Sequence, residues 1–168
     1  TQGSEAGVTL VLASNDRESK HRGITAFAIE AGTPGFTHHK LRGKMGVRSS
    51  DTAELVLSDV RLPDSARVGR VGSGFTDAMV ILDKGRISIG AMALGLGEAA
   101  LAAAISYAKE RKQFGDPIAD FQGLQWMLAD SRVELDAARL LLWRAATLAD
   151  QGKPFSTEAA IAKLHASE

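Results

Sequence analysis

The hydrophobic pattern of this chain changes its period once, between Pro63 and Gly74, and this change limits the possible folds. Before it, short β-branched and apolar runs alternate with turn residues, which predicts strands. We expect strands at Val8–Ala13, Ile24–Glu30, Phe36–Lys40 and Ala53–Leu62. Their connections are too short to hold a crossover helix, so the sequence predicts an antiparallel sheet.

After the glycines at positions 69, 72 and 74 the residues suit long helices, expected at 75–111 and 119–149. A third helix is expected to begin with Ser156 as its N-cap and Glu158 in its first turn, and it is unfinished at Glu168. The predicted fold class is α+β, an antiparallel sheet segment over 1–68 followed by an up-and-down helical bundle over 69–168. We expect a fragment of a longer protein, truncated at both ends.

Four glycines fall inside the first long helix, and each costs roughly 1 kcal/mol relative to alanine. They are Gly85, Gly90, Gly95 and Gly97. Such a cost indicates close packing, because small residues let a second backbone approach. We therefore expect this helix to be buried in a bundle or across a subunit interface.

The composition excludes several classes of function. Twenty basic and twenty acidic side chains cancel, so no long-range field favours nucleic acid or an anionic membrane as partner. The chain has no cysteine, which fits a reducing compartment. We find no apolar run long enough to span a bilayer and no signal-peptide pattern at the start, so we expect a soluble intracellular protein.

The four histidines do not predict a metal site. His38 and His39 are adjacent, so on a strand they face opposite ways, while His21 and His165 are isolated. The chain also lacks the short motifs of metal hydrolases, serine hydrolases and dinucleotide-binding folds. We expect no metal.

Two polar clusters are candidate sites, and the first of them exceeds what its local structure requires. The first is Glu110–Gln122, a junction between helices that holds Arg111, Gln113, Phe114 and, eleven residues after the arginine, Gln122. The second is the run Asp83, Lys84, Gly85 and Arg86 early in the first long helix. A helix-capping arginine with a turn-filling phenylalanine, and a solvated charged face, are the structural alternatives.

These clusters resemble motifs of the acyl-CoA dehydrogenase family. The junction is similar to its R-x-x-F-G…Q signature, and Leu82–Arg86 is similar to the L-D-x-G-R of its short-chain, butyryl-type members. The runs Lys44–Leu55 and Asp59–Pro63 resemble the end of its middle β-barrel domain, where their role is structural. Thr1 matches the last residue of the family's W-I-T stretch beside the flavin.

The resemblance implies an FAD-dependent acyl-CoA dehydrogenase of fatty acid β-oxidation, which oxidises a short-chain acyl-CoA to the trans-2-enoyl-CoA. It implies that Asp83, Lys84, Gly85 and Arg86 bind the substrate. It further implies that Arg111, Gln113, Phe114, Gln122 and Thr1 contact FAD, the first four across a subunit boundary.

The remaining implications concern partners and catalysis. They are a homotetramer, an electron-transferring flavoprotein as electron acceptor, and the bacterial cytoplasm or the mitochondrial matrix as location. The family's glutamate base falls beyond Glu168 in most members, and in a minority at the place of Gly85, so no catalytic residue is assigned in this chain. Alternatives are a flavin oxidase, such as an acyl-CoA or nitroalkane oxidase, a flavin monooxygenase, and a catalytically silent helical interaction module in which Trp126 and Trp143 form the partner surface.

Overall fold

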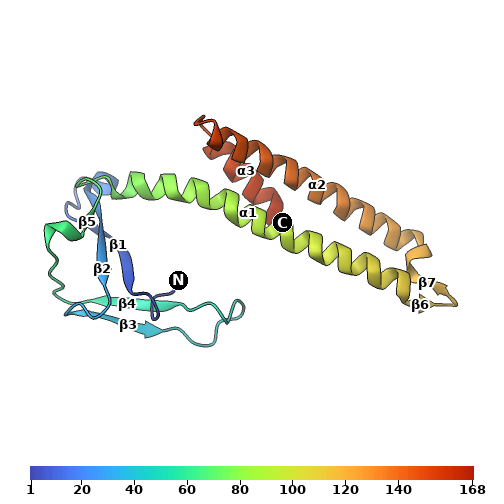
Figure 1. Ribbon diagram of the computed structural model, residues 1–168, viewed down its shortest axis with the longest axis horizontal. Helices are drawn as coiled ribbons and strands as arrows, with labels where there is room; N and C mark the ends of the chain where they lie inside the picture. Colours follow the sequence, from blue (N-terminus) through green and yellow to red (C-terminus); the bar gives the residue numbers. More distant parts are fainter. The chain divides into compact units, whose positions relative to one another are not determined.

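The computed structural model describes residues 1–168, which divide into two compact units, Thr1–Ala78 and Met79–Glu168 (Figure 1). Strands are the main regular structure of the first unit, and helices make up most of the second. The predicted domain boundary after residue 68 stays a prediction.

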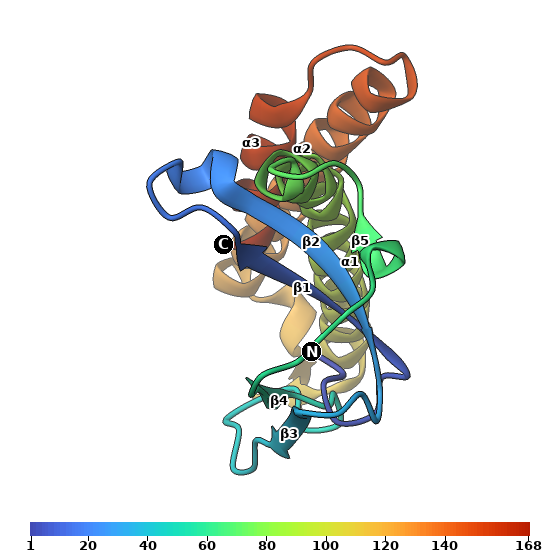
Figure 2. The same cartoon turned by 90° about the vertical axis from the view of Figure 1, so that its left-hand side faces the viewer.

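A three-stranded antiparallel sheet forms the main part of the first unit. Its order is β1 (Val8–Ser14), β2 (Ile24–Glu30) and β5 (Arg67–Val68), with β2 in the centre (Figure 2). The central strand carries the buried residues Thr25, Ala26 and Ile29, as its apolar and β-branched sequence predicts. A 3-10 turn at Lys20–Gly23 leads into it.

A second antiparallel pair joins β3 (Phe36–Lys40) to β4 (Ala53–Leu57). The predicted strand Ala53–Leu62 is therefore wrong in its second half. The chain turns after Leu57, where Asp59 has φ 52° and the Ser58 N–H donates to the Gly35 carbonyl at 2.9 Å. The positive φ of Asp59 turns the chain out of the ladder, and a 3-10 turn at Asp64–Ala66 follows.

The second unit contains the helices α1 (Gly74–Glu110), α2 (Gln122–Asp150) and α3 (Ser156–Ser167), of which α1 begins in the first unit. All three predicted helices are confirmed. The second begins three residues later than predicted, because Ile118–Asp120 form a separate 3-10 turn. A small hairpin of β6 (Lys112–Gln113) and β7 (Asp116–Pro117), which the sequence did not predict, precedes this turn.

The core of the helical unit lies where the three helices meet. Leu142 and Ala145 of α2 and Ala162 of α3 are buried, and Ile87 and Leu94 of α1 pack against them. Small side chains on α2 and α3 allow this close approach. Helix α3 lies beside the C-terminal part of α2 (Figure 1).

The glycines of α1 divide into two kinds. A Cβ at Gly90 would lie 2.7 Å from Leu142 Cδ2, and one at Gly97 would lie 2.7 Å from Leu135 Cδ2. A Cβ at Gly85 or Gly95 would meet nothing within 4 Å. The predicted close packing is therefore confirmed within the chain at Gly90 and Gly97, and at Gly85 and Gly95 it stays a prediction for a subunit interface.

Helix α1 is long and apolar enough to cross a membrane by length and composition. The expectation that no apolar run reaches this length is therefore wrong. One such helix is weak evidence for a membrane span, although only 17% of its most apolar stretch is buried within this structure. At Gly90 and Gly97 the helix approaches α2 closely, as a bundle helix does. We assign α1 no membrane role.

Candidate functional site

The charged cluster Asp83–Arg86 lies on one turn of α1. The Arg86 guanidinium donates to Asp83 Oδ1, three residues earlier, as neighbours on one helical face can. The Asp83 side chain is 19% exposed and that of Arg86 is 40% exposed. Lys84 is exposed, and open space surrounds the place where Gly85 lacks a side chain. Arg86 therefore keeps donors that a ligand can reach.

Ser156, at the start of α3, joins this cluster. Its hydroxyl donates to Asp83 Oδ2. The predicted N-cap at Ser156 is wrong, because Phe155 occupies the cap position and no side chain caps the helix. Glu158 does lie in the first turn, where it receives an ion pair from Arg144 at 3.2 Å. The sequence held no signal for the contact between Ser156 and Asp83, because 73 residues separate the two.

The hairpin that follows α1 displays the second cluster. Its turn residues Phe114 and Gly115 have φ 55° and 99°, the pair of positive angles typical of a tight two-residue hairpin turn. A positive φ disfavours a bulky residue such as phenylalanine, yet the side chain of Phe114 is 89% exposed and gains no core burial in return. An exposed aromatic in a strained conformation is typical of a binding site.

The hairpin is fixed to both adjoining helices. The Arg111 N–H donates to the Tyr107 carbonyl, and the Ile118 N–H donates to the Arg111 carbonyl, both at 2.8 Å. The ring centroids of Phe114 and Phe121 lie 6.4 Å apart in an edge-to-face arrangement, which brings the turn against the start of α2.

Gln122, the first residue of α2, follows Phe121 directly. The side chains of Arg111, Gln113 and Gln122 are exposed and make no hydrogen bond or ion pair within the chain. These residues fit a nucleotide cofactor chemically: a guanidinium for phosphate, amides for polar ring edges and an aromatic ring for an apolar face.

The two clusters lie at opposite ends of α1. From Arg86 to the end of the helix at Glu110 the rise of 1.5 Å per residue gives about 36 Å. The structure therefore does not bring the substrate-binding candidates together with Arg111, Gln113, Phe114 and Gln122. Thr1 is exposed in the first unit.

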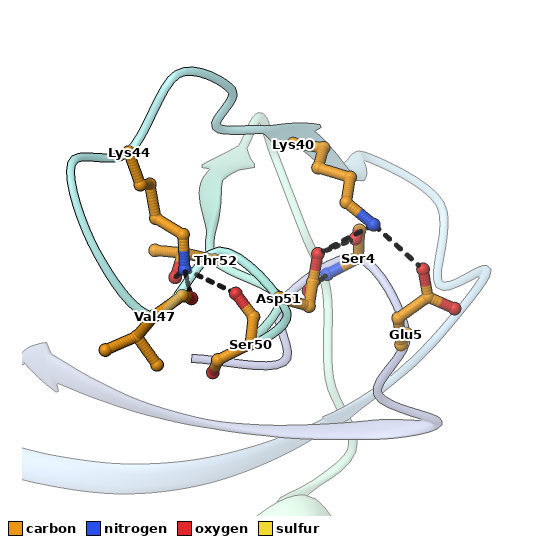
Figure 3. A network of polar contacts seen from close by, with 8 residues as sticks. All are labelled: Ser4, Glu5, Lys40, Lys44, Val47, Ser50, Asp51 and Thr52. Carbon is orange, nitrogen blue, oxygen red and sulfur yellow. Dashed lines mark hydrogen bonds and ion pairs between the residues drawn. The ribbon is translucent and has the colours of Figure 1, made fainter. Parts of the chain in front are cut away.

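A polar network that the sequence did not predict lies in the first unit (Figure 3). Asp51 is 8% exposed and accepts from the Ser4 hydroxyl and, at 2.8 Å, from the Ser4 N–H. The Lys40 ammonium lies 3.3 Å from Asp51 and 3.4 Å from Glu5. The two hydrogen bonds from Ser4, with a smaller effect of Lys40, lower the pKa of Asp51 to about 2.

Lys44 organises the loop beside this network. Its ammonium donates to the carbonyls of Val47 and Ser50 and to the Thr52 hydroxyl (Figure 3). With all three donors used inside the loop, Lys44 shapes the backbone between β3 and β4. This arrangement supports the structural role expected for the run Lys44–Leu55.

The structure contains no group of three or more acidic or histidine side chains that could hold a metal ion. A paired Asp and Arg on α1 and an exposed hairpin with free polar donors are thus its two candidate sites. Both lie on the helical part of an α+β chain.

Comparisons with known proteins identify the family. The model of the acyl-CoA dehydrogenase C-terminal domain matches residues 72–168, and that of the middle domain matches residues 1–60. A short-chain specific acyl-CoA dehydrogenase of Megasphaera elsdenii is 48% identical over 168 residues, which are the whole of this chain and 44% of that protein. The chain therefore belongs to the acyl-CoA dehydrogenase family and spans less than half the length of this relative.

Solved structures agree with this assignment. Butyryl-CoA dehydrogenase from Megasphaera elsdenii matches with a TM-score of 0.94 at 48% identity, over 99% of this chain and 43% of that one. The prolyl acyl carrier protein oxidase AnaB matches with a TM-score of 0.95 at 31% identity, over 99% of this chain and 44% of that one. The predicted family and α+β fold class are confirmed.

Proposed function

We propose that the full-length protein is an FAD-dependent acyl-CoA dehydrogenase that converts a short-chain acyl-CoA to the trans-2-enoyl-CoA. The observation that carries this proposal is the 48% identity to a short-chain specific relative over every residue of the chain. An electron-transferring flavoprotein is the proposed electron acceptor. The proposed location is the bacterial cytoplasm or the mitochondrial matrix.

In this proposal the cluster on α1 binds the acyl-CoA. Arg86 offers planar N–H donors to carbonyl or phosphate oxygens, and its pairing with Asp83 holds the guanidinium in one orientation. Lys84 adds a second, exposed positive charge. The open space at Gly85 lets a ligand approach the helix backbone. No residue of this chain is proposed as the base that removes the α-proton.

The hairpin at the other end of α1 holds the cofactor in this proposal. When bound, FAD accepts the hydride equivalent from the β-carbon of the acyl group. Arg111 would neutralise a phosphate, the exposed ring of Phe114 would pack on an apolar part, and the amides of Gln113 and Gln122 would meet polar edges. Thr1 is proposed as a further FAD contact, from the resemblance alone.

The distance between the two clusters supports an oligomer. At about 36 Å along α1, one chain cannot direct Arg86 and Phe114 to the same reacting centre. The substrate site of one subunit would thus use the cofactor contacts of another, as in the proposed homotetramer. Mixing two variants tests this: Arg86→Ala subunits and Phe114→Ala subunits should regain activity when dissociated and reassembled together, but not separately.

A flavin oxidase is the second candidate function, because the matched oxidase AnaB has the same fold at 31% identity. Oxygen uptake separates the two. A dehydrogenase supplied with butyryl-CoA and an artificial acceptor should form 2-enoyl-CoA with little oxygen uptake. Stoichiometric oxygen consumption without the acceptor would favour the oxidase.

The interaction module stays the third alternative. Trp126 and Trp143 are 65% and 62% exposed, as a partner surface requires. Purified full-length protein that retains no flavin would favour it.

A further inference from the structure

Ser156 places its hydroxyl on another helix instead of on its own. A serine at the start of a helix ordinarily accepts a bond from a free N–H of the first turn. Here the hydroxyl donates to the carboxylate of Asp83 on α1, and the first turn of α3 receives no side-chain cap. The Ser156 hydroxyl therefore acts on the Asp83 carboxylate and not on its own helix.

Asp83 is held from two sides. Its Oδ1 accepts from Arg86 and its Oδ2 accepts from Ser156, so a rotation of the carboxylate would break at least one bond. A half-buried carboxylate with both oxygens bonded has few accessible orientations. The Arg86 guanidinium has five N–H groups, only part of which Asp83 uses, and the Arg86 side chain is 40% exposed.

The packing of α1 on α3 fixes the place where Ser156 meets Asp83. A Cβ at Gly90 would lie 3.5 Å from Lys163 Cα and 3.7 Å from the Ala162 carbonyl, so the two backbones approach closely there. Gly90 lies seven residues after Asp83, and Lys163 lies seven after Ser156. Seven residues make two helical turns in both helices, so both contacts belong to one parallel register.

We propose that Ser156 is a positioning residue of the acyl-CoA site: it holds Asp83, which holds the ligand-facing donors of Arg86. Recognition of the carbonyl or phosphate oxygens of the acyl-CoA on α1 thereby depends on the first turn of α3. This inference rests on the proposed function of the same site and adds a residue of α3 to it.

The test uses the full-length flavin-containing protein with the variant Ser156→Ala. Thr157→Ala is the control, because Thr157 is exposed on the same turn and its side chain makes no hydrogen bond. The rate of flavin bleaching by butyryl-CoA without oxygen gives a half-saturating concentration and a limiting rate. We expect S156A to raise the half-saturating concentration about tenfold, the size of one hydrogen bond to a charged group, and to change the limiting rate less than twofold. T157A and Ser156→Thr should match the wild type.

A purely structural role of Ser156 would give a different pattern. An S156A protein that melts earlier but keeps the wild-type half-saturating concentration overturns the inference. If S156A fails to fold, the isosteric pair Ser156→Thr and Ser156→Val repeats the comparison, and equal half-saturation in both overturns it. In an Asp83→Asn background S156A should have no further effect, and additive effects contradict the relay through Asp83.

Measurements on the wild type distinguish a failure of the proposed function from a failure of the role of Ser156. Bleaching of the wild type with no effect of S156A overturns the role of Ser156 and leaves the proposed function standing. A wild type that retains flavin but is bleached by no acyl-CoA overturns both, because the substrate on which the inference rests is then absent.

Discussion

Replacing Gly90 with alanine tests how closely α1 packs on α2. Alanine stabilises a helix interior by about 1 kcal/mol relative to glycine. Gly95, on the same helix, offers a matched control because a Cβ there meets nothing within 4 Å. Gly95→Ala should therefore keep the full gain in the free energy of unfolding.

Gly90→Ala has the same intrinsic gain but creates a clash. Its Cβ would lie 2.7 Å from Leu142 Cδ2, and Leu142 is only 4% exposed, so the leucine must move within a packed core. Such overpacking costs about 1–3 kcal/mol. Gly90→Ala should thus lie between neutral and about 2 kcal/mol less stable than the wild type, and about 1–3 kcal/mol below Gly95→Ala.

Urea unfolding followed by the helical circular dichroism signal measures both variants. The midpoints should differ while the dependence on urea stays the same. If Gly90→Ala stabilises the chain as much as Gly95→Ala does, the close approach of the helices at Gly90 is refuted. Leu142→Ala alone should cost about 2–5 kcal/mol, and in its background Gly90→Ala should become stabilising because the clashing methyl group is gone.

Three further predictions concern the polar groups and the proposed sites. The pKa of Asp51 is lowered from 3.8 to about 2, so the stability that its carboxylate contributes is complete above about pH 4 and is lost as the pH falls towards 2. Asp51→Asn should therefore melt earlier than the wild type at neutral pH, and its melting temperature should fall less between about pH 4 and about pH 2. If the melting temperature of Asp51→Asn falls as much as that of the wild type, Asp51 is not the cause of the acid destabilisation. Phe114→Ala should leave the melting temperature of the 168-residue chain nearly unchanged, since the ring is 89% exposed. In the full-length protein the same change should lower the ratio of flavin to protein absorbance. A ratio equal to that of the wild type would contradict the proposed contact between Phe114 and FAD. Arg86→Lys should raise the half-saturating concentration of butyryl-CoA about tenfold, because it removes the planar donors. Arg132→Lys is the control and should leave this concentration unchanged, because Arg132 pairs with Asp136 on an exposed face of α2. Equal effects of the two changes would refute the assignment of Arg86.

Local patterns in the sequence were sufficient to predict most of the fold. The alternating run Ile24–Glu30 and the long apolar stretch of α1 each carry a period that their own residues determine, and both elements are present. The hairpin of Lys112–Gln113 and Asp116–Pro117 could not be predicted in this way, because two residues per strand contain no period. The early end of β4 coincides with the positive φ of Asp59, which the apolar pattern of Ala53–Leu62 does not show.

The candidate sites show the same division between local and distant contacts. The pairing of Asp83 with Arg86 follows from their spacing on a helix. The partner of Asp83 on α3 and the partner of Asp51 near the start of the chain depend on how distant segments pack, which no local pattern encodes. Ser156 shows the consequence, since the local rule predicts a helix cap and the tertiary contact takes the hydroxyl instead.

The visible spectrum of the full-length protein during an anaerobic titration with butyryl-CoA tests the central proposal most directly. The account predicts a bound flavin whose absorption band bleaches as the acyl-CoA is added, because the substrate transfers its electrons to the cofactor. A flavin band that acyl-CoAs of every chain length leave unchanged would contradict the proposed reaction, and a protein without flavin would contradict the proposed cofactor site.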